Sequence, residues 1–144
     1  MAGFAPDTSY MIAAVCAWHT HHERVVTDFE RRLARRESMI VAAPALVEAY
    51  AVLTRLPPPH RLAPTDALTL LDANFLRLGR LVALRGADYA ALLRAAPADG
   101  VSGGRTYDAV ILQCAVAGRA SALLTFNVAH FATLAGQRLD VVAP

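Results

Sequence analysis

The chain has 144 residues, a length typical of one domain with a single hydrophobic core. Because 56% of its residues are hydrophobic and only 18% are charged, the composition excludes an intrinsically disordered protein. No apolar run reaches the roughly 20 residues that span a bilayer, and the first positively charged side chain is Arg24, so no basic region of a signal peptide is present. We therefore expect a cytoplasmic protein with no membrane contact.

The first half of the chain predicts two strands separated by helices. Asp7 or Thr8 can cap the first helix, Pro44 suits the first turn of a later one, and the three prolines at 57–59 end it. The predicted elements are a strand over 2–6, a helix over about 8–15, a loop over 18–23, an amphipathic helix over about 22–36, a strand over 39–43 and a helix over 44–55.

The second half continues the alternation of helices and strands. The predicted elements are a helix over about 64–78, a strand over 80–84, a helix over 87–96, a flexible loop over 97–104, a helix over 105–117 and strands over 120–125 and 139–143. Alternating strands and helices are typical of a parallel sheet that is covered on both faces. We therefore predict a single α/β domain over 1–144, with a mainly parallel central sheet of about five strands flanked by helices on both faces.

Three acidic residues stand alone in apolar surroundings. Asp7, Glu48 and Asp108 are each the only charged side chain in a run of 13 or more residues. A buried carboxylate without a partner costs several kcal/mol. A shared divalent cation would explain all three at once, because Mg²⁺ and similar hard cations prefer oxygen ligands. The sequence therefore predicts a site for Mg²⁺ or Mn²⁺.

The predicted topology brings these acids to one edge of the sheet. Asp7 follows the first strand, Asp108 opens a helix, Glu48 lies in the first turns of another, and Asn127 follows the strand over 120–125. Each acid also has a simpler explanation. Asp7 could be a helix cap, Asp108 could complement a helix dipole, and Glu48 could lie on an exposed helix stripe.

Four segments resemble, in order, the motifs of PIN-domain proteins, and most closely those of VapC-type toxins. They are Pro-Asp-Thr-Ser-Tyr-Met-Ile-Ala-Ala at 6–14, Val-Glu-Ala-Tyr-Ala-Val-Leu-Thr-Arg at 47–55, Ser-Gly-Gly-Arg-Thr-Tyr-Asp-Ala-Val-Ile at 102–111 and Leu-Leu-Thr-Phe-Asn-Val-Ala-His-Phe at 123–131. The resemblance implies a PIN-like domain and a metal-dependent endoribonuclease. By motif position, Asp7, Glu48 and Asp108 would be both catalytic residues and metal ligands.

The resemblance also suggests roles for neighbouring residues. Asn127 occupies a position where the family often has an acid, and its carbonyl oxygen would be an outer metal ligand. His130 likewise replaces a frequent aspartate, which leaves the predicted pocket less negative. Thr8 or Ser9 would orient a carboxylate or a metal-bound water, and Arg105 is the candidate for holding the RNA backbone.

VapC-type toxins pair with a small antitoxin, so the resemblance implies a VapB-type partner and a homodimer. A non-catalytic PIN-like module with an RNA-binding or regulatory role remains an alternative. Such a module would bind RNA but have little affinity for metal ions. A Mg²⁺-dependent phosphatase is disfavoured. It would need an aspartate where Ser9 stands and a downstream lysine, and the chain has no lysine.

Three other features have plain interpretations. Cys16 and Cys114 lie in apolar helical patterns and are expected to be reduced core thiols. The histidines at 19, 21 and 22 match no common zinc spacing and are interpreted as part of a polar loop. The glycine-rich segment 100–104 lacks the spacing and lysine of a P-loop and is interpreted as a hinge.

Overall fold

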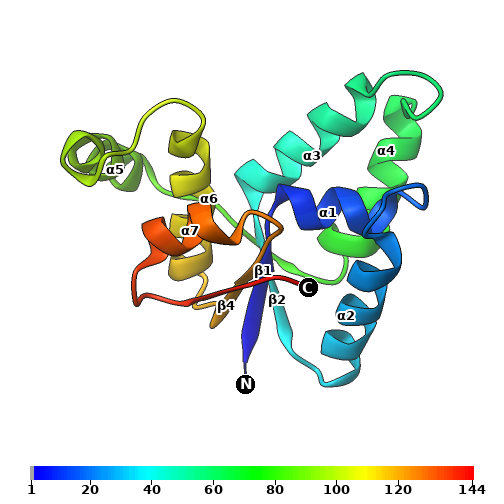
Figure 1. Cartoon of the computed structure of the whole chain (residues 1–144), viewed down its shortest axis with the longest axis horizontal. Coiled ribbons are helices and arrows are strands. Elements are labelled where there is room, and N and C mark those ends of the chain that lie inside the picture. Colours follow the sequence, from blue (N-terminus) through cyan, green and yellow to red (C-terminus); the bar gives the residue numbers. More distant parts are fainter. Residues whose placement is uncertain (1) are drawn as a thin grey trace.

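A computed structural model describes residues 2–144, and its centre is a five-stranded sheet in the order β3-β2-β1-β4-β5. All neighbouring strands are parallel. The strands are β1 (Gly3–Pro6), β2 (Ser38–Ala42), β3 (Arg80–Val82), β4 (Ala122–Leu124) and β5 (Asp140–Val142) (Figure 1). The prediction of a parallel α/β sheet is confirmed.

Helices cover both faces of this sheet, as predicted. In Figure 1, α1 to α4 lie on one side of the strands and α5 to α7 on the other. The helices are α1 (Thr8–Val15), α2 (His22–Ala34), α3 (Ala43–Arg55), α4 (Pro64–Leu71), the π-helix η1 (Asp72–Leu76), α5 (Gly86–Asp99), α6 (Arg105–Ala117) and α7 (Val128–Ala135). Among residues 2–144, no helix is both long and apolar enough to cross a membrane.

Strand β1 lies in the middle of the sheet, and all four of its residues are buried. A strand in this position is covered on both faces and therefore needs apolar or small side chains throughout. Phe4 is fully buried and pairs in register with Met39 on one side and Ala122 on the other. Gly3 permits close packing of β2, since a Cβ atom there would lie 2.8 Å from Cδ1 of Ile40. The central position of β1 places whatever follows it at the middle of the sheet edge.

The cysteines lie in the core, as predicted. Cys16 and Cys114 are both free and buried. Burial raises the pKa of both thiols, and that of Cys114 reaches about 11. Both therefore act as small apolar core residues.

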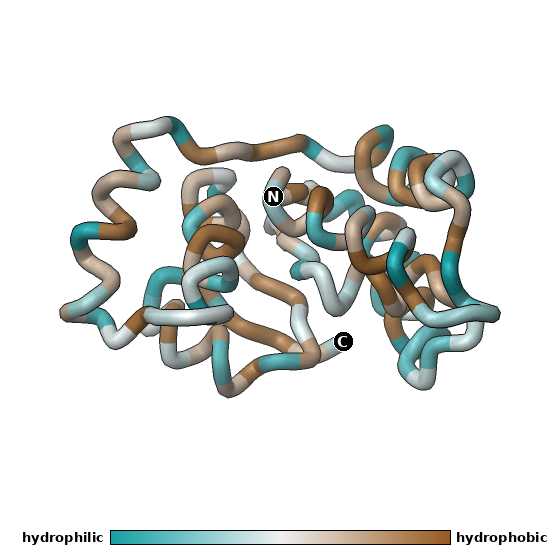
Figure 2. The backbone as a smooth tube through the Cα atoms, turned by 90° about the horizontal axis from the view of Figure 1, so that it is seen from above, coloured by the Kyte–Doolittle hydropathy of each residue, from teal (hydrophilic) through white to brown (hydrophobic). Residues whose placement is uncertain are grey.

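The predicted loop over 97–104 is wrong at its start, because α5 continues through Pro97 to Asp99. No residue of α5 is buried, and Figure 2 shows the helix at the outer edge of the molecule. Pro97 has no N–H to donate to the carbonyl group one turn earlier. Because α5 is exposed, water can bind that carbonyl group instead. The helix ends at Asp99, and Gly100 caps it with a φ of 69°, the left-handed conformation that glycine adopts readily.

Two further helices differ from the prediction. The helix expected over 64–78 is α4 followed by the π-turn η1, and it ends at Leu76. Helix α7 was not predicted at all. It is short and has no side-chain cap at Asn127, but it buries Phe131 and Ala135, which are one turn apart. Packing against α6 and β5 stabilises a segment whose local sequence signals are weak.

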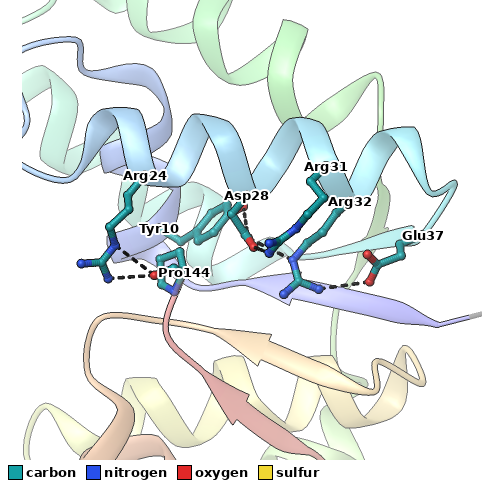
Figure 3. A network of polar contacts seen from close by, with 7 residues as sticks. All are labelled: Tyr10, Arg24, Asp28, Arg31, Arg32, Glu37 and Pro144. Atoms are coloured by element: carbon teal, nitrogen blue, oxygen red, sulfur yellow. Dashed lines mark hydrogen bonds and ion pairs between the residues drawn. The ribbon is translucent and has the colours of Figure 1, made fainter.

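A buried carboxylate joins α1 to α2. Asp28 is 4% exposed, and its Oδ2 accepts hydrogen bonds from the Tyr10 hydroxyl at 2.9 Å and from Arg32 Nε at 3.0 Å (Figure 3). Arg31 bonds to the other carboxylate oxygen, and Arg32 also reaches Glu37. Burial and the charge of Asp28 raise the pKa of Tyr10, so its hydroxyl stays protonated and donates. The network fixes the helices on one face of the sheet.

We expect Tyr10→Phe to lower the free energy of unfolding by about 1.5–3 kcal/mol, the range for a hydrogen bond to a charged group. The ring remains, so the loss reports the hydroxyl alone. The matched control is Arg77→Ala, which breaks the more exposed ion pair to Asp72 and should cost less than about 1 kcal/mol. Urea denaturation measures both, and a Tyr10→Phe protein as stable as wild type would contradict the prediction.

Candidate functional site

Asp7 occupies the end of the central strand. It follows Pro6 directly and is the N-cap of α1, where its Oδ1 accepts the backbone N–H of Tyr10 at 2.9 Å. The residue is only 3% exposed. A carboxylate at a helix N-terminus is favoured by the helix dipole and by free N–H groups. The fold therefore holds one charged group at the middle of the carboxyl edge of the sheet.

Two hydroxyl groups fix the carboxylate of Asp7. Ser9 Oγ donates to Oδ1 at 2.6 Å, and Thr125 Oγ1 donates to Oδ2 at 2.5 Å. Each hydroxyl in turn accepts a backbone N–H, Ser9 from Phe126 at 3.2 Å and Thr125 from Asn127 at 2.9 Å. Because a hydroxyl has one hydrogen, these contacts direct both hydrogens at Asp7. The segment after β4 thereby locks the carboxylate that follows β1.

Asp7 opens into a pocket of about 270 Å³ that α1, α3, α6 and two loops surround. Its lining contains six of the seven residues that the sequence singled out, together with four others. The lining residues are Asp7, Thr8, Ser9, Ile12, His19, Glu48, Val52, Asp108, Ile111 and Asn127. The predicted acids and Asn127 thus reach one pocket from four elements.

Arg105 does not line this pocket. It lines a larger neighbouring cavity of about 570 Å³ among α5, α6 and α7, half-buried one turn before Asp108. That cavity contains the acids Asp88 and Asp99 but none of the three predicted metal ligands. The smaller pocket, rather than the larger cavity, therefore concentrates the candidate chemistry.

The acids in the pocket influence one another. Burial raises the pKa of Asp7 against the hydrogen bonds from Ser9, Thr125 and the Tyr10 N–H, and the negative charge of Asp108 raises it further. Glu48 is only partly desolvated at the pocket rim, but this desolvation raises its pKa as well, and the charge of Asp108 adds to the rise. The negative charge of Asp108 makes it harder for the other two carboxyl groups to ionise, and a bound cation would relieve this repulsion.

Positive groups near the rim offset part of this repulsion. Burial raises the pKa of Asp108, whereas the charges of His130 and Arg105 lower it. His130 Nδ1 lies 3.8 Å from Asp108 Oδ2, a distance that makes an ion pair when the ring is protonated. Arg55 and the Thr8 hydroxyl lower the pKa of Glu48, although the direct hydrogen bond of Thr8 is to the carbonyl oxygen of Ala45 at 3.3 Å.

The premise that all three acids are buried is wrong for Glu48. Asp7 is buried and Asp108 has 27% of its side chain exposed, but Glu48 is exposed on the pocket rim. The buried stripe of α3 is formed by Ala45, Ala49 and Leu53, which leaves Glu48 on the side facing the pocket and solvent.

Within residues 2–144, no three His, Cys, Asp or Glu side chains lie close enough together to form a ready-made metal cluster. Asp7 is held in place by its hydrogen bonds, so the adjustment falls to the other two acids. The exposed side chain of Glu48 is free to change its rotamer. Ligation of one ion by Asp7, Glu48 and Asp108 together therefore requires movement of Glu48 or bridging water.

Two residues of this site had no role assigned from the sequence, although Thr125 was expected at the same rim and His19 in a polar loop. Thr125 is fully buried and binds Asp7 directly, and His19 lines the pocket from the loop between α1 and α2. A signal for Thr125 was present, because a lone hydroxyl follows the apolar strand β4. Only the folded chain shows that the hydroxyl faces Asp7.

We expect Thr125→Val to destabilise the metal-free protein at pH 7 by about 1–3 kcal/mol. The change keeps the side-chain shape but leaves Asp7 Oδ2 without its donor and the Asn127 N–H without its acceptor. Ser121→Ala is the matched control, because it removes a neutral hydrogen bond to the Gly3 carbonyl at the other end of β4 and should cost less. Equal unfolding curves for the two variants would contradict the role given to Thr125.

Comparison with known proteins places these observations in a family. The PIN-domain family model matches residues 4–136. Ribonuclease VapC40 of Mycobacterium tuberculosis is 39% identical over 141 residues, which cover 95% of this chain and 96% of the relative. Ribonuclease VapC27 of the same organism is 38% identical over 116 residues, which cover 81% of this chain and 79% of the relative.

Solved structures show the same fold at low sequence identity. VapBC2 of Rickettsia felis, bound to a DNA fragment from its promoter, superposes with a TM-score of 0.70 at 17% identity and covers 99% of this chain and 98% of its own. VapC20 of M. tuberculosis, described as a toxin that cleaves the sarcin-ricin loop, has a TM-score of 0.67 at 14% identity and covers 90% and 93%.

Proposed function

Since the chain belongs to the PIN-domain family, we propose that it is a metal-dependent endoribonuclease, the toxin of a VapBC-type toxin–antitoxin pair. One observation carries this proposal. A buried aspartate at the end of the central strand, held by three donors, opens into a pocket with two further carboxylates. Such a pocket repels an RNA phosphate unless a cation lies between them.

The donor set fits Mg²⁺ or Mn²⁺. Asp7, Glu48 and Asp108 offer carboxylate oxygens, and Asn127 adds a carbonyl oxygen on the same pocket wall. A carboxylate has about four lone-pair positions, and three of those on Asp7 accept hydrogen bonds. The position left on Oδ2 would face the cation. When bound, the ion would activate a water and neutralise charge on the phosphate.

The surrounding residues would orient these ligands and the substrate. Ser9 and Thr125 prevent Asp7 from rotating away from the pocket. Thr8 ties the start of α1 to the backbone of α3, which carries Glu48. Arg105 would bind an RNA phosphate beside the pocket, where its charge already acts on Asp108.

The proposed partners follow from the family. VapBC2 of R. felis is a complex of a toxin and an antitoxin. By analogy, a small VapB-type antitoxin would bind this chain and block its pocket, and two copies would form a homodimer. An RNA-cutting toxin of this kind would act in the cytoplasm.

A non-catalytic RNA-binding module is the second candidate. It is favoured by the exposure of Glu48 and by the amide of Asn127 at a position where relatives often have an acid. It predicts RNA binding that neither Mg²⁺ nor EDTA alters. The two candidates therefore differ in metal dependence, not in fold.

Purified protein should cut a structured RNA pool with Mg²⁺ or Mn²⁺ and not with EDTA. Asp7→Asn and Asp108→Asn should each reduce cutting by about a hundredfold or more, because each removes a charged metal ligand. Asp66→Asn is the matched control, since it removes an acid in the first turn of α4, away from the pocket, and should cut normally. RNA binding without cutting under any metal, with antitoxin absent, would favour the non-catalytic module.

Asn127→Asp should tighten Mn²⁺ binding by about tenfold, because ligand charge strongly tunes the affinity of oxygen sites. The same change should lower the melting temperature of the metal-free protein, since it adds a like charge near Asp108. Titration calorimetry and thermal unfolding with and without Mn²⁺ measure the two effects. If Asn127→Asp and Asn127→Ala bind Mn²⁺ alike, the residue is not a ligand.

A further inference from the structure

Five side-chain rings form a continuous band beside the carboxylate pocket. His60 stacks on Trp18 with ring centroids 4.2 Å apart and an interplanar angle of 27°. Trp18 is followed by His19 at 5.9 Å, and His19 by Phe126 at 6.3 Å. His21 stacks on Phe126 at 4.6 Å and 18°. We call these five residues the aromatic band.

The aromatic band meets the pocket at its middle ring. His19 lines the pocket together with Asp7, Glu48 and Asp108. Phe126 donates its backbone N–H to Ser9, the residue whose hydroxyl holds Asp7. A ligand held in the pocket would therefore have the rings of the band as its immediate neighbours.

One end of the band is open to solvent. Trp18 is 47% exposed and His60 is also exposed. They come from the loop between α1 and α2 and the loop between α3 and α4, which lie on the same side of the sheet in Figure 1. If these rings served only to join the two loops, the larger one would be expected to bury most of its surface. Half of the tryptophan surface remains available to a ligand.

The band carries positive or neutral groups and no acid. Three of its rings are imidazoles, and the guanidinium of Arg24 lies 5.7 Å from the centroid of Phe126. The loop over 16–22 contains no acidic residue. Flat rings with nearby cations suit nucleobases and phosphates.

We propose that the aromatic band stacks unpaired bases of the RNA whose phosphate lies at the carboxylate pocket, with Trp18 as its largest exposed platform. The proposal rests on the ribonuclease function proposed above. Unpaired bases can leave their own stack and lie on tryptophan, phenylalanine or histidine, whereas bases in a duplex are already stacked and paired. The band would therefore select single-stranded segments.

Trp18 provides a direct test, because it is the only tryptophan of the chain. Its fluorescence is recorded with Mg²⁺ in an Asp108→Asn background, which is expected to leave RNA intact while a cation can still lie between the phosphate and the remaining acids. The titrant is a single-stranded oligoribonucleotide of about ten nucleotides. The same sequence as a blunt duplex is the control ligand. We expect the single strand to quench the emission strongly and the duplex to leave it nearly unchanged.

Variants then separate stacking from a structural role. Trp18→Leu should weaken single-strand binding by about tenfold, the effect of losing one base stack, and Trp18→Phe should restore most of it. Tyr89→Leu is the matched control, because Tyr89 is an exposed aromatic residue on α5, on the other face of the sheet, and should bind as wild type. Polarisation of a labelled oligonucleotide measures all four proteins.

The outcomes distinguish this proposal from the ribonuclease function. Metal-dependent cutting by wild type, without quenching and with equal binding by Trp18→Leu, would overturn the base-stacking role and leave the nuclease intact. The band would then be a contact between loops or a protein interface. Quenching by the single strand without cutting under any metal would support the aromatic band and reject the nuclease.

Discussion

The carboxylate of Asp7 is the constraint around which the site is arranged. It is buried at the end of the central strand, where an unsolvated charge is costly. Three donors offset that cost, and they come from two places: the first turn of α1 and the segment after β4. Because β1 and β4 are neighbours in the sheet, the register of one strand pair decides whether Thr125 can reach Asp7.

This arrangement separates rigidity from adaptability within one pocket. Asp7 is fixed by hydrogen bonds on both oxygens, whereas Glu48 is exposed and has no comparable restraint. A fixed ligand defines where a cation would bind, and a mobile one can complete the coordination after the ion arrives. The metal-free protein bears the like-charge repulsion among these acids, which is a typical cost of a preorganised site.

Much of the architecture followed from local patterns, and the failures have identifiable causes. The strands and the helices at 8–15, 44–55 and 105–117 were predicted because caps, prolines and apolar periodicity agreed with one another. Helix α7 was missed because its formation depends on packing rather than on a cap. The extension of α5 past Pro97 was missed because the prediction treated proline as a stop, although the helix is exposed.

The sequence by itself determined the fold class, the family resemblance and most of the polar residues that line the pocket, because strand–helix alternation, motif order and isolated acids are local properties. Only the tertiary structure decided how those residues differ. It buried Asp7, exposed Glu48, placed Arg105 in a neighbouring cavity and directed Thr125 at Asp7. It also stacked Trp18 and other rings beside the pocket. Burial and contact depend on which elements meet in space, which no spacing along the chain specifies.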